Sequence, residues 1–221
     1  MMQASSRKIV SSQPGPHPRL AQTIARHEQH EWRKPEQHVD QEALNTLDQA
    51  LEAWSGTVIL DSFCGTGMST NVIARQYPEA LVIGVDKSLH RLERAETPAE
   101  NVLLLRAHCE AIWRHLVSRG QLVQKHFLLY PNPWPKPGHL GRRVHGHPAF
   151  TLLPALGGDL ELRSNWQIYV EEFGIALHLL GHISRIGTID PESPMTLFEK
   201  KYQDSGHRLW RLNVRFDSGS Q

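Results

Sequence analysis

Short apolar runs alternate with segments of helical spacing through the middle of the chain. The runs are rich in valine, isoleucine and leucine, which is typical of strands that are buried on both faces. Strands that alternate with helices predict a parallel sheet with helices on both sides. We therefore predict an α/β fold, doubly wound, with a mostly parallel sheet of about seven strands. The expected strands are residues 57–61, 80–86, 101–106, 126–130 and 158–164, and the expected helices between them are residues 68–77, 88–96, 109–119 and 147–156.

The two ends of the chain show different patterns. Residues 1–38 are polar and rich in proline and histidine, and they predict an extended basic arm with a short helix near residues 19–31. Residues 39–221 predict one domain, which begins with a helix whose apolar face is Leu44, Leu47, Leu51 and Trp54. The last expected elements are helices at residues 166–180 and 195–204 and an antiparallel pair of strands at residues 182–189 and 208–216.

Composition narrows the class of protein only slightly. The chain has 24 basic and 23 acidic residues, so its net charge of +1 neither requires nor excludes a polyanionic partner. Two cysteines, Cys64 and Cys109, are too few for a disulfide framework, and no run has the length of a membrane span, so we expect a cytoplasmic protein. None of the 14 histidines lies in a His-x-x-x-His pattern with a carboxylate partner, and we expect no metal site.

The first predicted strand runs into a glycine turn, LDSFCGTG. Gly65 and Gly67 allow a tight turn and close approach of a ligand, and carboxylates stand at the ends of the first two strands, at Asp61 and Asp86. A dinucleotide site would have a third glycine where Thr70 stands, so the pattern favours S-adenosylmethionine instead. The simpler alternative is a turn with two solvated aspartates.

Four prolines stiffen the loop that follows the fourth predicted strand, YPNPWPKPGH. Each residue before a proline is pushed toward extended geometry, so we expect Tyr130, Asn132, Trp134 and Lys136 to be extended. Such a loop is either a rigid exit from a strand or a preorganised site.

Three stretches give the chain a resemblance to a known family. They are LDSFCGTGMSTNVIARQYPEALVIGVD, YPNPWPKPGHLGRRVHGHPAF and SPMTLFEKKYQDSGHRLWRL, and over residues 55–212 the chain resembles the tRNA (guanine-N7)-methyltransferases. The resemblance implies S-adenosylmethionine as cofactor, tRNA as substrate, and a monomer or homodimer. The cofactor-binding positions that it implies are Asp61, Gly65, Gly67, Asp86, His108 and Asn132, the substrate-binding positions are Lys136, Arg142, Arg143, Asn165, Thr196 and Glu199, and the catalytic position is Asn132.

Several positions depart from the family pattern. Asn132, His108 and Asn165 stand where the family has aspartates, and Phe63 stands where it usually has glycine. Guanine N7 carries a lone pair and no proton, so its methylation needs orientation and no general base. We therefore expect the loss of the aspartate charge at Asn132 to slow the reaction without abolishing it.

Two alternatives remain open from the sequence. The segment Asn132–Trp134 resembles the Asn-Pro-Pro-aromatic loop of amino-methyltransferases, in which an asparagine carbonyl holds the amino group. A second alternative is a cofactor-binding paralogue that acts on a small molecule or lacks activity on tRNA.

Overall fold

The computed structural model describes residues 6–30, 32–33, 35 and 37–217. The chain divides into two compact units. Unit 1 comprises residues 1–32, 130–151 and 161–215, and unit 2 comprises residues 33–129, 152–160 and 216–221. The expected boundary between an arm and a domain at residue 38 stays a prediction.

The strands follow the order β3-β2-β1-β4-β5-β7-β6 in a seven-stranded sheet. β1 pairs in parallel with β2 and with β4, β2 pairs in parallel with β3, and β6 pairs antiparallel with β7. The predicted doubly wound, mostly parallel α/β fold is therefore confirmed. The strands are β1 (Thr57–Ser62), β2 (Ala80–Asp86), β3 (Val102–Arg106), β4 (Lys125–Leu129), β5 (Gly158–Ser164), β6 (Ser184–Ile189) and β7 (Leu209–Phe216).

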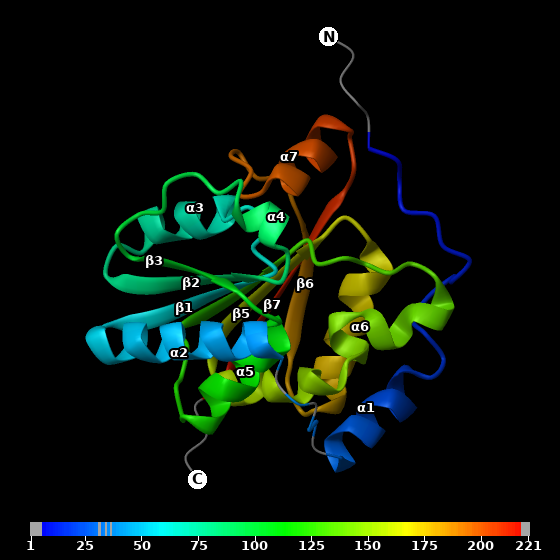
Figure 1. The fold of residues 1–221 in the computed structure, drawn as a ribbon. Coiled ribbons are helices and arrows are strands. Elements are labelled where there is room, and N and C mark those ends of the chain that lie inside the picture. The colour runs from blue at the N-terminus through cyan, green and yellow to red at the C-terminus, as the bar shows by residue number, and fades with distance from the viewer. Residues whose placement is uncertain (1–5, 31, 34, 36, 218–221) are drawn as a thin grey trace. The chain divides into compact units, whose positions relative to one another are not determined.

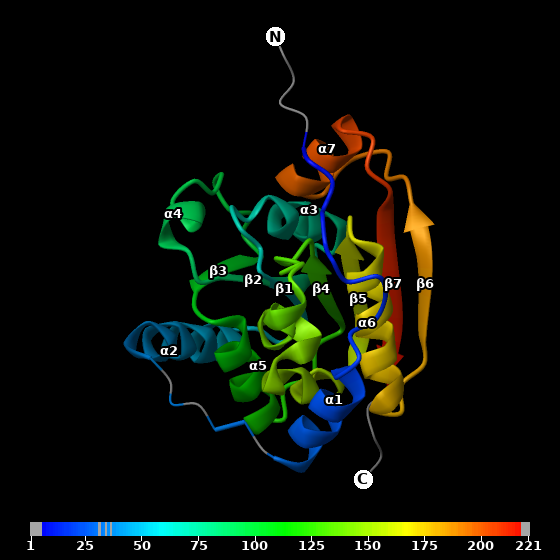
Figure 2. The ribbon, with the colours of Figure 1, turned by 90° about the vertical axis from the view of Figure 1, so that its right-hand side faces the viewer.

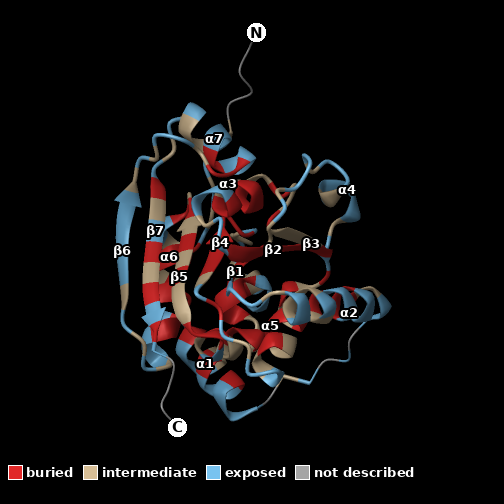
Figure 3. Cartoon of the chain, turned by 90° about the vertical axis from the view of Figure 1, so that its left-hand side faces the viewer, coloured by how far each residue is buried: buried red, intermediate tan, exposed pale blue. Residues whose placement is uncertain are grey.

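Unit 2 has helices on both faces of its parallel strands. In Figure 1, α3 (Met68–Gln76) and α4 (Leu89–Leu92) lie above β1 to β3, while α2 (His38–Ala53) and α5 (Cys109–Ser118) lie below them. Figure 2 shows the same arrangement from a second direction. This cover on both faces explains why every residue of β2 is buried (Figure 3).

Unit 1 is built around the antiparallel pair β6 and β7 and the helix α6 (Gln167–Leu179). α6 packs against β6, and α1 (Leu20–Gln29) packs in turn against α6. Gly174 permits the close approach of α6, because an added Cβ there would lie 3.0 Å from Ile186 Cδ1. The helix α7 (Leu197–Asp204) connects β6 to β7.

Two expected helices differ from the observed ones. The helix expected at residues 88–96 is only the four residues of α4, and none of them is buried, so no apolar face stabilises a longer helix. Residues 147–156 form two 3-10 helices, Pro148–Leu152 and Pro154–Leu156, in place of an α-helix. Proline lacks the N–H of an α-helix and disfavours helical geometry in the residue before it, which accounts for the short pieces.

Candidate functional site

The turn after β1 in unit 2 contains three residues with left-handed backbone geometry. Gly65 and Gly67 have φ angles of 64° and 73°, as a tight turn into α3 requires. Phe63 has a φ of 63°, although it has a side chain. A left-handed φ costs a residue with a Cβ roughly 1–2 kcal/mol, which explains why glycine suits this position. Edge-to-face contact with Trp113, at 6.1 Å between ring centroids, accompanies this geometry.

Asp61, at the carboxyl end of β1, is fully buried. Its Oδ2 accepts hydrogen bonds from Ser69 Oγ and Thr70 Oγ1, both at 2.7 Å, while its Oδ1 is buried without a hydrogen-bond partner. Burial, followed by repulsion from Asp86, raises the pKa of Asp61 to about 6. A buried carboxylate oxygen without a donor is uncommon and favours a ligand that supplies one.

Asp86, at the end of β2, is also buried but its carboxylate is occupied by donors. Oδ2 accepts from Gly65 N at 3.1 Å and from Arg91 Nη1 at 3.3 Å, and Oδ1 accepts from Ser88 N at 2.8 Å. Half of the Arg91 side chain is exposed, so it is free to leave the carboxylate. The sequence analysis missed Arg91, which lies five residues after Asp86 on the short helix α4.

His108 follows β3 and is held by a residue that the sequence analysis missed. Asp40 Oδ1 accepts from His108 N at 2.8 Å and lies 3.1 Å from His108 Nδ1. Burial favours a raised pKa for Asp40, but the hydrogen bonds from His108 and Gln37 outweigh it and lower that pKa. A capping box between Gln37 and Asp40 begins α2, and the Gln-x-x-Asp spacing was the available signal.

Two of the residues expected to be extended in the proline-rich loop of unit 1 have left-handed geometry instead. Tyr130 and Trp134 have φ angles of 55° and 46°, whereas Lys136 is extended. The prolines restrict the preceding residues, yet these two adopt the left-handed region. Asn132 is exposed, and its Oδ1 accepts from Trp134 N at 3.3 Å, which closes a local turn.

Two cationic side chains near this loop are exposed, at Lys136 and Arg142. The guanidinium of Arg142 lies 4.9 Å from the centre of the Trp134 ring, a cation–π contact. Arg143 differs from expectation because its side chain is fully buried and forms an ion pair with Glu172. It is therefore not available to phosphate in this structure.

Thr196 and Glu199 form the start of α7. Thr196 Oγ1 accepts from Glu199 N at 2.9 Å, as an N-cap does. The fully buried Glu199 carboxylate accepts from Tyr130 Oη at 2.7 Å, Arg163 Nη1 at 2.9 Å and Met195 N at 2.7 Å. The Thr-x-x-Glu motif is thus a helix cap joined to a buried ion pair, and its capping spacing was visible in the sequence.

Asn165 follows β5 and is partly buried. Its Nδ2 lies 3.1 Å from Nδ1 of His207, whose ring stacks on that of Tyr202. The structure thus groups Asp61, Gly65, Gly67 and Asp86 in unit 2, and separately links Glu199 to Tyr130 in unit 1.

The fold and the carboxylates at the ends of β1 and β2 define the class I, Rossmann-like methyltransferase architecture. The antibiotic-resistance methyltransferase Kmr matches the fold with a TM-score of 0.55 at 19% identity, covering 80% of this chain and 94% of that one. The 16S rRNA methyltransferase KamB matches with a TM-score of 0.55 at 20% identity, covering 78% and 93%.

Sequence comparison gives the family. The model of the family described as "Putative methyltransferase" matches residues 55–212, and the chain belongs to that family. The tRNA (guanine-N(7)-)-methyltransferase of Bordetella pertussis is 27% identical over 209 residues, which cover 79% of this chain and 80% of that protein. The protein of the same name from Pectobacterium atrosepticum is 28% identical over 185 residues, covering 74% of each chain. The predicted resemblance is confirmed.

No helix among the described residues is long and apolar enough to cross a membrane. Within the same residues, no group of three or more histidine, cysteine, aspartate or glutamate side chains is arranged to hold a metal ion.

Proposed function

We propose that this protein transfers a methyl group from S-adenosylmethionine to guanine N7 in tRNA. The relatives named above support the substrate, and membership of a methyltransferase family supports the reaction. A tRNA substrate also agrees with the predicted cytoplasmic location.

The single observation that carries the cofactor assignment is the unpartnered Oδ1 of Asp61. This oxygen is buried beside the left-handed turn of Gly65 and Gly67, and its carboxyl is mostly ionised at pH 7. An ammonium group supplies both the missing donor and the opposite charge. The residues present therefore fit S-adenosylmethionine, with Asp61 near its amino group and Asp86 accepting from its ribose hydroxyls once Arg91 withdraws.

S-Adenosylmethionine supplies an electrophilic methyl group on a positively charged sulfur. The residues of this chain do not need to remove a proton, because guanine N7 carries a free lone pair and no proton. Asn132 provides a carbonyl oxygen without charge, and its hydrogen bond to Trp134 N fixes the direction of that carbonyl. We propose that Asn132 orients the reacting groups.

Lys136 and Arg142 are the proposed contacts with tRNA phosphates, because both side chains are exposed. Phosphate contacts position a nucleic acid without reading its sequence. We do not extend this role to Arg143, which is buried against Glu172.

We assign Thr196 and Glu199 an anchoring role in the substrate site. Both oxygens of the Glu199 carboxylate already accept hydrogen bonds from the protein, Oε1 from Tyr130 and Arg163 and Oε2 from Met195 N. Glu199 instead fixes the start of α7 relative to Tyr130 and Arg163 within unit 1.

The proposal is tested by incubating the protein with methyl-labelled S-adenosylmethionine and unmodified tRNA, followed by digestion to nucleosides. We expect the label in 7-methylguanosine. The matched control is Asp86→Ala, which removes the ribose-facing carboxylate and should abolish labelling at low cofactor concentration. Cofactor binding is measured in parallel by calorimetry.

The other outcomes identify the alternatives. Label in a nucleoside methylated at an exocyclic amino group would show that the protein is an amino-methyltransferase and does not methylate guanine N7. Absence of label in tRNA, from protein that binds the cofactor, would overturn the assignment and indicate a different substrate.

A further inference from the structure

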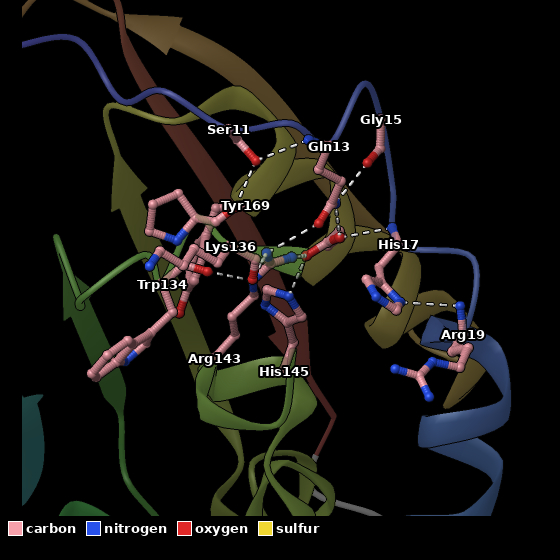
Figure 4. Close-up of polar contacts among 12 residues, drawn as sticks. Ser11, Gln13, Gly15, His17, Arg19, Trp134, Lys136, Arg143, His145 and Tyr169 are labelled. Carbon is pink, nitrogen blue, oxygen red and sulfur yellow. Dashed lines mark hydrogen bonds and ion pairs between the residues drawn. The ribbon is translucent and has the colours of Figure 1, made fainter. Parts of the chain in front are cut away.

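Residues 11–17, which precede α1, are built into a buried polar network of unit 1 (Figure 4). Its centre is Glu172 on α6, whose carboxylate is fully buried. Glu172 Oε1 accepts from Gln13 Nε2 at 2.6 Å and from His17 N at 2.8 Å. Glu172 Oε2 accepts from Arg143 Nη1 at 2.5 Å and lies 2.8 Å from His145 Nε2. The carboxylate thus has two partners on each oxygen.

The network is balanced in charge. Burial acts to raise the pKa of Glu172, but the hydrogen bonds from His145 and Arg143 and the charge of Arg143 lower it to about 2. Burial lowers the pKa of His145, so the buried charges are one carboxylate and one guanidinium. Gln13 connects the two, because its Nε2 donates to Glu172 while its Oε1 accepts from Arg143 Nη2 at 3.1 Å. Figure 4 shows the side chains of Gln13, Arg143 and His145 pointing toward one another.

Arg143 and Ser11 hold three successive carbonyl groups of the proline-rich loop. Arg143 Nε donates to Trp134 O at 3.2 Å, and Arg143 Nη2 donates to Lys136 O at 3.4 Å. Ser11 Oγ donates to Pro135 O at 2.6 Å, between them. Pro135 has no N–H to donate, so its carbonyl is the polar backbone group by which that residue can be held.

We propose that Ser11, Gln13, Arg143 and Glu172 are positioning residues, which fix residues 134–136 and thereby the directions of Asn132 and Lys136 toward substrate. This inference deepens the proposed function and rests on it. On this proposal, a segment predicted to be an extended basic arm contributes to the substrate site.

The backbone geometry of Trp134 supports a positioning role. A tryptophan with a φ of 46° is in a sparsely populated region, and such geometry persists where surrounding contacts fix it. Arg143 donates hydrogen bonds to the carbonyl of Trp134 itself and to that of Lys136, two residues later. A buried ion pair often adds little net stability. We therefore assign the Arg143–Glu172 pair the role of specifying the geometry of the loop.

The test uses Gln13→Met, which keeps the volume of the side chain and removes its hydrogen bonds. The matched control is Gln22→Met, because Gln22 is exposed on α1 in the same part of the chain. Ser11→Ala is a milder variant that removes only the bond to Pro135 O. Hydrogen exchange of backbone amides and steady-state methyl transfer to tRNA are measured for each variant, well below its melting temperature.

For Gln13→Met we expect amide exchange in residues 134–143 to accelerate about tenfold or more, while exchange in β7 stays unchanged. We also expect kcat for methyl transfer to fall roughly tenfold with little change in KM for S-adenosylmethionine, since a misplaced loop loses orientation. Ser11→Ala should show the same pattern with a smaller amplitude, and Gln22→Met should match the natural protein.

Two results would overturn the inference. The first is exchange in residues 134–143 that Gln13→Met leaves unchanged. The second is an acceleration spread equally over β7, which would indicate general destabilisation. If the natural protein labels no guanine but Gln13→Met still loosens residues 134–143 selectively, the network stands and the proposed substrate fails.

Discussion

Asp61 in unit 2 and Glu172 in unit 1 are both fully buried carboxylates, and their pKa values move in opposite directions. Asp61 has one oxygen without a partner, and burial raises its pKa to about 6. Glu172 has donors on both oxygens, and these lower its pKa to about 2. Both side chains are fully buried, so the difference comes from their partners: Asp61 has two hydroxyl donors and the repelling charge of Asp86, whereas Glu172 has the Arg143 guanidinium and donors on both oxygens.

The difference separates two uses of a buried charge. A carboxylate that the protein leaves incompletely paired is costly in the ligand-free chain and gains from a cationic ligand. A carboxylate that is completely paired has nothing to offer a ligand, and its removal affects the geometry and stability of its partners. Glu199 is intermediate, since its Oε1 has two protein donors and its Oε2 has one.

The largest expected effect is on stability, for Glu172→Gln. The neutral amide leaves the buried Arg143 guanidinium without its counter-charge, which should lower the free energy of unfolding by about 3–5 kcal/mol. Urea unfolding measures it. The control is Glu171→Gln on the same helix, whose partner Gln167 is exposed. Equal stability of the two variants would show that the network at Glu172 is not a balanced ion pair.

Asp61→Asn should weaken cofactor binding without lowering the free energy of unfolding, which is the opposite of the effect expected for Glu172→Gln. Asparagine keeps the shape but loses the charge, so we expect S-adenosylmethionine to bind roughly 10- to 100-fold more weakly, as for loss of a charge-assisted hydrogen bond. The free energy of unfolding without ligand should stay equal or rise, because no charge is buried. Calorimetry and thermal melting provide the two measurements, with the partly exposed Asp159→Asn as control. Unchanged affinity would remove Asp61 from the cofactor site.

The pH dependence follows from the raised pKa of Asp61. In the folded protein the carboxyl is protonated below about pH 6, so cofactor affinity should fall about tenfold between pH 7 and pH 5. Stability of the ligand-free protein has the reverse sign: the contribution of Asp61 is complete below its unfolded pKa of 3.8 and is lost as pH rises through about 6. Affinity titrations at several pH values check this, and Asp61→Asn should flatten the dependence.

The smallest effect concerns Arg91→Ala. Arg91 is half exposed and pairs with Asp86, and such pairs contribute about 0.2–1 kcal/mol. Its removal should free the carboxylate and tighten cofactor binding by up to about fivefold. Weaker binding of the cofactor to Arg91→Ala would show that Arg91 contacts it directly. Arg94→Ala, on the same segment, serves as the control.

Local patterns in the sequence predicted most of the fold. The expected strands at residues 80–86 and 158–164 match β2 and β5, because a short apolar run between turns specifies its own ends. The glycine turn and the aspartates at the ends of β1 and β2 were also predicted from neighbours in the chain. The geometry of this turn and the positions of these aspartates depend on residues that are close in sequence.

Long-range partners could not be predicted in this way. Gln13, Arg143 and Glu172 come from three distant segments, and nothing in their local patterns specifies that they meet. Pre-proline restriction predicted extended backbone at Trp134, but bonds from Arg143 and the local turn at Asn132 select another geometry. The role of Thr196 as a helix cap could be predicted from its spacing to Glu199, whereas its role in substrate binding stays a prediction.

The position of Ser11 and Gln13 also matters for how the protein is produced. Residues before a first helix are commonly removed or replaced by an affinity tag, on the view that they are dispensable. In this chain a start after residue 17 would leave Glu172 Oε1 without its two donors and Pro135 O without Ser11. A shortened protein could then retain the fold and the cofactor while giving a misleadingly low activity, so residues 11–17 belong in any preparation used for kinetics.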